Sequence, residues 1–253
     1  MSMNRRVLIL GGATYQLPAI NEALIRGDYV ILFSNNPLDP GVELADEYHN
    51  ISISDHEAVI KLAELIDVNY VLGYVSETAM KSASAVTEAL GLACVQGEVL
   101  QTCIRKDLFR NFKATHEFAY PNYIVVSEGH RHIPKEDKLR YPLIVKPVDS
   151  CGSRGVSRIE RKENLPPALT YAFKHSSNKL AIIEEEVSAN NRQFTGDGFM
   201  INGHLAFFSF GEHLFDTKTS RVTACGSVWP AKVSSIVNHE INHTIESHLS
   251  RIG

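Results

Sequence analysis

The sequence lacks features that would immediately indicate a nucleic-acid or membrane partner. No basic block is longer than a few residues, and 25 Lys and Arg face 29 Asp and Glu, a formal net charge of −4. This balance lacks the positive footprint of a nucleic-acid-binding surface. No apolar run approaches the length of a bilayer span. The first one, Val7 to Leu10, is also too short for the core of a signal peptide.

Cysteine is scarce and scattered as well. The chain has four, Cys94, Cys103, Cys151 and Cys225, and they form no C-x-x-C pair. Without an export signal we expect reduced thiols rather than disulfides. The hydrophobic content of 44% over 253 residues is enough to bury a sizeable core. These properties predict a cytoplasmic α/β protein of two domains, with no nucleic-acid or membrane partner.

The N-terminal third alternates between apolar runs and helical periodicity. Strands are predicted near 7–10, 29–33 and 70–72, and helices near 15–26, 56–66 and 77–90. Such alternation indicates βαβ units and a twisted parallel sheet.

The first turn of this sheet argues against a dinucleotide site. It reads Gly11-Gly-Ala-Thr-Tyr15, which lacks the G-x-G-x-x-G spacing, and the second strand ends in Ser34-Asn35-Asn36 instead of an acid that would grip a ribose. The helix N-terminus that follows the turn remains a candidate site for an anion such as a substrate carboxylate or phosphate.

The most informative stretch is 141–156. The apolar run Leu143 to Val145 predicts a buried strand, Lys146 stands at its exit, and the small residues from Ser150 to Gly155 follow. Glycines allow the backbone to turn successive N–H groups towards an anion, and a lysine beside such a loop suits a polyphosphate. The alternative is a basic strand end followed by a flexible hairpin.

Three further segments help to decide between a phosphate-binding loop and a flexible hairpin. Ala181 to Val187 runs from apolar residues into three carboxylates, and Asn202-Gly203 is a strong hairpin signal. The segment 181–187 is either a strand with a charged end or a hinge that offers backbone groups to a base edge. Upstream, the amphipathic helix predicted from Thr102 to Lys113 carries Lys106. The simplest interpretation is that Lys106 lies on a solvated face of this helix.

Three features of the sequence resemble ATP-grasp enzymes in their order and spacing: Lys106 on its helix, the 141–156 stretch, and the 181–187 segment before the Asn-Gly hairpin. The resemblance is to the carbamoyl-phosphate synthase and biotin carboxylase side of that superfamily, which includes carboxylate–amine ligases. The resemblance implies a Rossmann-like parallel-sheet pre-ATP-grasp domain over 1–115. An incomplete α+β ATP-grasp domain would follow, with an N-terminal lid subdomain over 116–190 and the start of a C-terminal subdomain over 191–253.

The resemblance also implies a set of site residues. Lys106 and Lys146 would contact the phosphates of ATP, and a mobile loop would close over them. The hinge would meet the adenine edge, and Gln193 stands where relatives often place a glutamate on the ribose. The loop and hinge residues are Gly152, Ser153, Gly155, Glu184, Glu185 and Val187.

Small-molecule carboxylate and amine substrates are implied, together with Mg²⁺. The magnesium ligands are expected on strands beyond Gly253, unless acids such as Glu212 or Asp216 replace them. No metal ligand is therefore assigned. The alternative function is a truncated or split protein that binds nucleotide without turnover of its own. The expected assembly is a homodimer or a second chain that completes the site.

Other segments of the sequence also carry reactive or charged side chains. His239-Glu240-x-x-His243 matches the zinc-protease helix motif, and zinc hydrolysis is a further alternative, but the periodic apolar residues from Val237 to Ile252 explain the segment as an amphipathic helix. Cys151 is read as a small residue of a phosphate loop and not as a nucleophile. His213 and Arg221 are candidates for contact with phosphates or a substrate acid.

Overall fold

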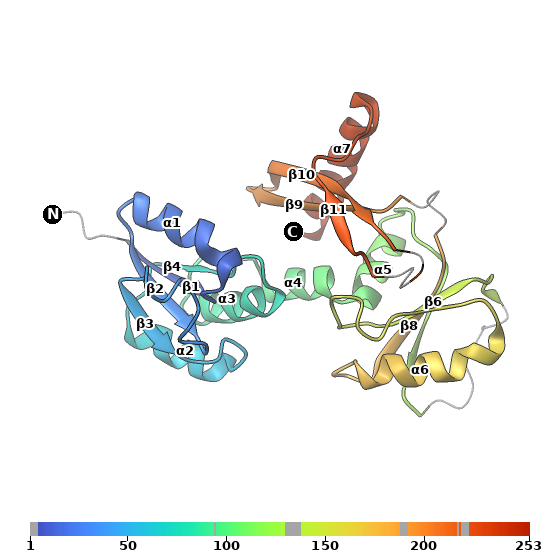
Figure 1. The fold of residues 1–253 in the computed structure, drawn as a ribbon, viewed down its shortest axis with the longest axis horizontal. Coiled ribbons are helices and arrows are strands. Elements are labelled where there is room, and N and C mark those ends of the chain that lie inside the picture. Colours follow the sequence, from blue (N-terminus) through green and yellow to red (C-terminus); the bar gives the residue numbers. More distant parts are fainter. Residues whose placement is uncertain (1–4, 94, 130–137, 188–191, 217, 219–222) are drawn as a thin grey trace. The chain divides into compact units, whose positions relative to one another are not determined.

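A computed structural model describes residues 5–93, 95–129, 138–187, 192–216, 218 and 223–253. The chain divides into two compact units, Met1–Gln101 and Thr102–Gly253 (Figure 1). The finer boundaries expected after residues 115 and 190 stay predictions. Within the described ranges, no helix is both long enough and apolar enough to cross a membrane.

The first unit is built on a four-stranded parallel sheet in the order β3-β2-β1-β4. Its strands are β1 (Arg6–Leu10), β2 (Tyr29–Ser34), β3 (Glu47–Asn50) and β4 (Tyr70–Leu72). Its helices are α1 (Leu17–Ile25), α2 (His56–Leu65) and α3 (Glu77–Ala89), and α4 (Gly97–Ile104) follows. The predicted strands and helices are confirmed, whereas β3 was missed because its sequence, Glu-Tyr-His-Asn, is polar.

Helices cover both faces of this parallel sheet. Ile20 of α1 packs with Ile9 and Val30 on one face, while Val59 of α2 and Ala83 of α3 belong to the cluster on the other. Strands that are buried on both faces read as continuous apolar runs, which is why the central strands show no alternation.

The second unit contains two sheets. The strands β5 (Tyr123–Ser127), β6 (Leu143–Pro147), β7 (Ser157–Ile159) and β8 (Leu180–Glu185) form an antiparallel sheet in the order β5-β8-β6-β7. The strands β9 (Phe194–Ile201), β10 (His204–Leu214) and β11 (Gly226–Val228) form the other, in the order β11-β10-β9. The helices of this unit are α5 (Lys106–Thr115), α6 (Leu165–Lys174) and α7 (Ser235–Ile252).

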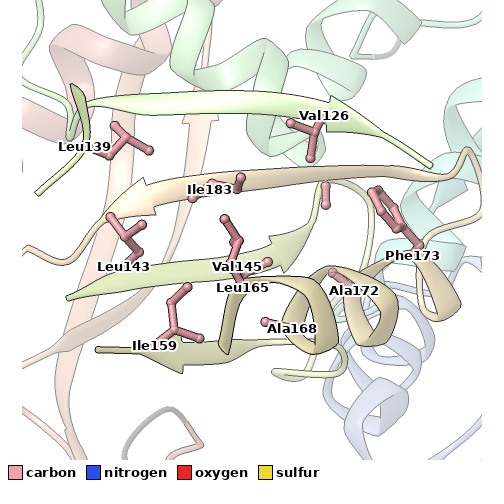
Figure 2. Close-up of a cluster of buried hydrophobic side chains, with 11 residues drawn as sticks. Val126, Leu139, Leu143, Val145, Ile159, Leu165, Ala168, Ala172, Phe173 and Ile183 are labelled. Carbon is pink, nitrogen blue, oxygen red and sulfur yellow. The ribbon is translucent and has the colours of Figure 1, made fainter. Parts of the chain in front are cut away.

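The four-stranded sheet of the second unit is apolar on the face that α6 covers. Val145 of β6 and Ile183 of β8 have no exposed surface, and they pack with Ala172 of α6 (Figure 2). Successive residues of a strand point to opposite faces, so Lys146 and Glu184 point away from this core. The second face of the sheet is therefore the one that can carry polar chemistry.

The Asn-Gly hairpin prediction is confirmed. Asn202 and Gly203 join β9 to β10, with φ of 51° and 77°. Positive φ at both central positions is typical of a type I′ turn, which the Asn-Gly pair favours.

Two predictions about helices are wrong. The helix expected from Thr102 to Lys113 is broken at Arg105, whose φ of −83° and ψ of 118° are extended, so that α5 starts at Lys106. The periodic apolar stripe of α7 is not buried either. Val237 is 38% exposed, and His248, which stacks on the Phe118 ring, is the buried residue of α7.

The core under α6 should be sensitive to loss of volume. Replacing Ile183 by alanine should lower the free energy of unfolding by about 2–5 kcal/mol, because its side chain has no exposed surface and would leave a cavity. Urea titrations followed by the fluorescence of Trp229, the one tryptophan, measure the change. Ile236→Ala is the control, because Ile236 is 70% exposed, and it should stay within about 0.5 kcal/mol of the parent.

Candidate functional site

The candidate site lies on the face of the β5-β8-β6-β7 sheet opposite α6. Glu184 of β8 pairs directly with Tyr123 of β5 and with Ile144 of β6, and Lys146 is two residues farther along β6. The period of two in a strand puts these side chains on one face.

At the centre of this face, the carboxylate of Glu184 lies between two cations. Lys146 Nζ is 2.6 Å from Oε2 and Arg110 Nε is 2.7 Å from Oε1. The Glu184 side chain is 5% exposed, and those of Lys146 and Arg110 are each 18% exposed. The Arg110 contact is an ion pair without hydrogen-bond geometry, because Nε and Oε1 are both buried without a hydrogen bond.

This cluster has more positive than negative charge. Two cations face the single carboxylate of Glu184, in a place where water screens them poorly. Burial, and next the charge of Arg110, lower the pKa of Lys113 on the same helix. A partly buried excess of positive charge is most stable with an anion beside it.

Lys106 is the first residue of α5 and connects this helix to the loop after β6. Its backbone N–H donates to the Val148 carbonyl at 3.0 Å, and its Nζ donates to the Ser150 carbonyl at 2.6 Å. These contacts bring Lys106 to the start of the glycine-containing loop, 44 residues away in sequence. The extended backbone of Arg105 separates Lys106 from α4, so that α5 starts at the residue that bonds to the loop.

The loop that follows has an unusual backbone. Gly152, Ser153 and Gly155 have φ of 65°, 57° and 78°. A Cβ on Gly155 would come within 2.6 Å of Pro147 Cγ and 2.9 Å of His175 Cβ, so a side chain at this position is excluded by both space and φ. Gly152 faces open space. A backbone of this type can turn N–H groups towards an anion.

The exit of β8 holds the other predicted residues. Glu185 points to the opposite face from Glu184, and Arg140 binds it through Nη2 at 2.9 Å and through its backbone N–H at 3.0 Å. These hydrogen bonds lower the pKa of Glu185 from 4.5 to about 2. Val187 is 68% exposed, and the carbonyl of the exposed Gln193 accepts a hydrogen bond from the His213 backbone N–H.

The described residues do not fit a magnesium site. Glu212, a candidate ligand, is held by Arg192 in two hydrogen bonds of 2.8 and 2.7 Å, which lower its pKa. Asp216 accepts a hydrogen bond from the Lys218 backbone N–H. In the described part of the chain, no group of three or more His, Cys, Asp or Glu side chains is arranged to hold a metal ion.

The zinc motif has no metal group either: His239 and His243 lie on exposed positions of α7, and within the described ranges no third His, Cys, Asp or Glu side chain joins them to hold a metal ion. Cys151 is exposed, with its Sγ 3.6 Å from Arg154 Nη2. Nδ1 of His213 on β10 is buried without a hydrogen bond, and Arg221 lies outside the described residues.

Sequence reasoning missed Arg110. The sequence did contain a signal for Arg110, because it lies four residues after the predicted site residue Lys106, and such positions share one face of a helix. Nothing in the sequence showed that this face meets β8, where Glu184 lies 74 residues farther along the chain.

Comparisons with known proteins agree with this geometry. The family model for the D-ala D-ala ligase C-terminus matches residues 114–244, more than half of the chain. The chain therefore belongs to this family, within the ATP-grasp superfamily. The predicted fold class, a parallel-sheet domain followed by the antiparallel sheets of an ATP-grasp domain, is confirmed.

Individual relatives are distant. The chain is 23% identical over 196 residues to a formate-dependent phosphoribosylglycinamide formyltransferase of Prochlorococcus marinus, covering 76% of this chain and 50% of that protein. The structure of L-amino acid ligase from Bacillus licheniformis matches all of the chain with a TM-score of 0.73 and 18% identity, over 61% of its own length.

A third relative is the biotin carboxylase domain of Hydrogenobacter thermophilus 2-oxoglutarate carboxylase, a dimer crystallised with MgADP, ADP and bicarbonate. It matches all of the chain with a TM-score of 0.75 and 16% identity, over 59% of its length. The chain thus spans between half and two thirds of the length of these relatives, and at such identities the structural matches show the fold alone.

The Arg140–Glu185 pair should affect stability in acid. Because the pKa of Glu185 falls from 4.5 to about 2 on folding, the pairing stabilises the protein fully above about pH 4.5 and is lost as pH falls towards 2. Arg140→Gln should therefore reduce the fall of the urea midpoint between pH 5 and pH 3. Glu185→Gln should flatten the same window, and an unchanged profile in both variants would contradict the assignment. Salt should weaken the effect, because the Arg140 side chain is 82% exposed.

Proposed function

We propose that this chain binds ATP on the sheet face that carries Lys146 and Glu184, as part of an ATP-dependent carboxylate–amine ligase. The observation that carries the proposal is the partly buried cluster in which Lys146 and Arg110 outnumber the single carboxylate of Glu184. Lys146 of this cluster lies on β6, which leads into the loop whose backbone suits an anion. Membership of the ATP-grasp superfamily supports the same ligand.

In the proposed reaction, a carboxylate oxygen of the acid substrate attacks the γ-phosphorus of ATP and ADP leaves. An amine then attacks the carbonyl carbon of the acyl phosphate and forms the amide bond, while inorganic phosphate leaves with the electrons of the C–O bond and takes up the proton that the nitrogen loses. The chain's own contribution is positioning and charge stabilisation, which is the usual basis of phosphoryl transfer.

The proposed roles follow from where the residues lie. Lys146 neutralises phosphate charge from the sheet, and Lys106 does so from the N-terminus of α5, where a helix attracts anions. The loop residues Gly152, Ser153 and Gly155 supply backbone N–H groups above the phosphates.

The remaining predicted residues are assigned to the adenine edge and the ribose. Glu184 and Val187 at the end of β8 meet the adenine largely through the backbone, with Glu185 held between them by Arg140. Gln193 is exposed near the start of β9 and serves the ribose as a neutral donor and acceptor. Magnesium has no place in this scheme among the described residues, so no step is assigned to it.

A second candidate function is nucleotide binding without turnover, with the catalytic acids supplied from outside these residues by a second chain. One observation favours it: no three-ligand metal group is found among the described residues.

The lysine assignment has a direct test. Lys146→Ala should weaken ATP binding at least tenfold, about 1.4 kcal/mol, because it removes a desolvated charge contact. Titration with a fluorescent ATP analogue measures the affinity. Lys61→Ala is the control, because Lys61 is an exposed lysine of α2 paired with Glu57, and it should bind as the parent does. Equal affinities in all three proteins would reject the site.

Turnover separates the two candidate functions. If the chain acts as the proposed ligase by itself, the parent should release ADP faster than the Lys146→Ala variant when Mg²⁺ and a panel of carboxylates and amines are supplied. If it only binds nucleotide, the two proteins should release ADP equally slowly. A coupled assay for ADP measures the rate. Robust release by the parent alone would favour the complete ligase and reject the binding-only alternative.

A further inference from the structure

The proposal above counts the charge of Arg110 but assigns it no function of its own, although it contacts the central carboxylate of the site. It is 18% exposed, and its Nε lies 2.7 Å from Glu184 Oε1. The other oxygen of the same carboxylate is 2.6 Å from Lys146 Nζ. Both cations thus compete for one partner, and either can neutralise it when the other leaves.

The competition matters because Lys146 cannot serve two anions equally. An opposite charge at 2.6 Å in a poorly hydrated place holds a lysine ammonium strongly. To reach a phosphate, the ammonium must weaken its contact with Glu184. If Arg110 were absent, this movement would leave a carboxylate that is 5% exposed without either of the two cations that pair with it among the described residues, which is strongly unfavourable.

We propose that Arg110 is a positioning residue for nucleotide binding, which neutralises Glu184 so that the Lys146 ammonium can transfer from this carboxylate to a phosphate of the ligand. The inference rests on the proposed ATP site. It requires no contact between Arg110 and the nucleotide. Before binding, Glu184 is the anion that holds Lys146 on the site face, and afterwards a phosphate replaces it.

The geometry of the ion pair fits this role. Nε of Arg110 and Oε1 of Glu184 are close but form no hydrogen bond, so the interaction is that of a charge and not of a directional donor. A lysine, which acts as a point charge, should therefore replace Arg110 better than it replaces an arginine in a bidentate pair.

The test is a double-mutant cycle read by calorimetric titration with ATP and, separately, with adenosine. Arg110→Gln should weaken ATP binding at least tenfold and change adenosine binding less than threefold, because only the phosphate contact depends on Lys146. Arg110→Lys should restore ATP affinity to within threefold of the parent. Arg6→Gln removes a half-buried arginine–glutamate pair from the first unit, with Nη2 3.1 Å from Glu47, and serves as the matched control.

The cycle is closed by Glu184→Gln. Once the carboxylate is neutral, Lys146 needs no replacement partner, so adding Arg110→Gln to Glu184→Gln should change ATP affinity less than threefold. A tenfold or larger loss in that background would mean that Arg110 acts on the ligand or the scaffold directly, and would overturn the inference. This comparison stands even if Arg110→Gln alone does not fold. Absence of ATP binding by the parent would instead reject the proposed function, and the inference with it.

Discussion

The second unit depends on one electrostatic constraint: a buried carboxylate must have a counter-charge. Glu184 is 5% exposed on a sheet whose other face is apolar, and it draws Lys146 from β6 and Arg110 from α5 to itself. Buried ion pairs contribute little net stability, because desolvation offsets most of the attraction. They do, however, specify position. The contact brings α5, β6 and β8, which are far apart in sequence, to one small area.

The apolar core under α6 is what makes this constraint effective. Val145 and Ile183 have no exposed surface, and each is adjacent in sequence to a member of the charged cluster. Since strand residues alternate between faces, the burial of one residue determines the direction of the next. The packing of hydrophobic side chains on one face therefore orients Lys146 and Glu184 on the other, and a register slip of one residue would exchange the two faces.

The loop and the start of α5 are linked in a similar way. Lys106 holds the Ser150 carbonyl, and Gly155 fits where a Cβ would meet Pro147 and His175. The start of α5, the end of β6 and the loop after it are thus connected to one another. A site that is organised in advance loses less conformational entropy on binding. Glu185 and Glu212 are likewise held in place, each by an arginine.

Much of the fold followed from local patterns. Apolar runs and helical periodicity located β1, β2 and β4, and Asn202-Gly203 located the hairpin, because strand period and turn dihedrals are local properties of the chain. The polar strand β3 and the break at Arg105 were not predicted. Strand β3 depends on its pairing with β2, and the break depends on the hydrogen bond of the next residue, Lys106, to Val148. By itself, the sequence determined the composition of the site: lysines, a glycine loop and an acidic strand end. Only the tertiary structure decided that Arg110 lies beside Glu184, because the contact between α5 and β8 joins residues far apart in sequence and exists only in the folded chain.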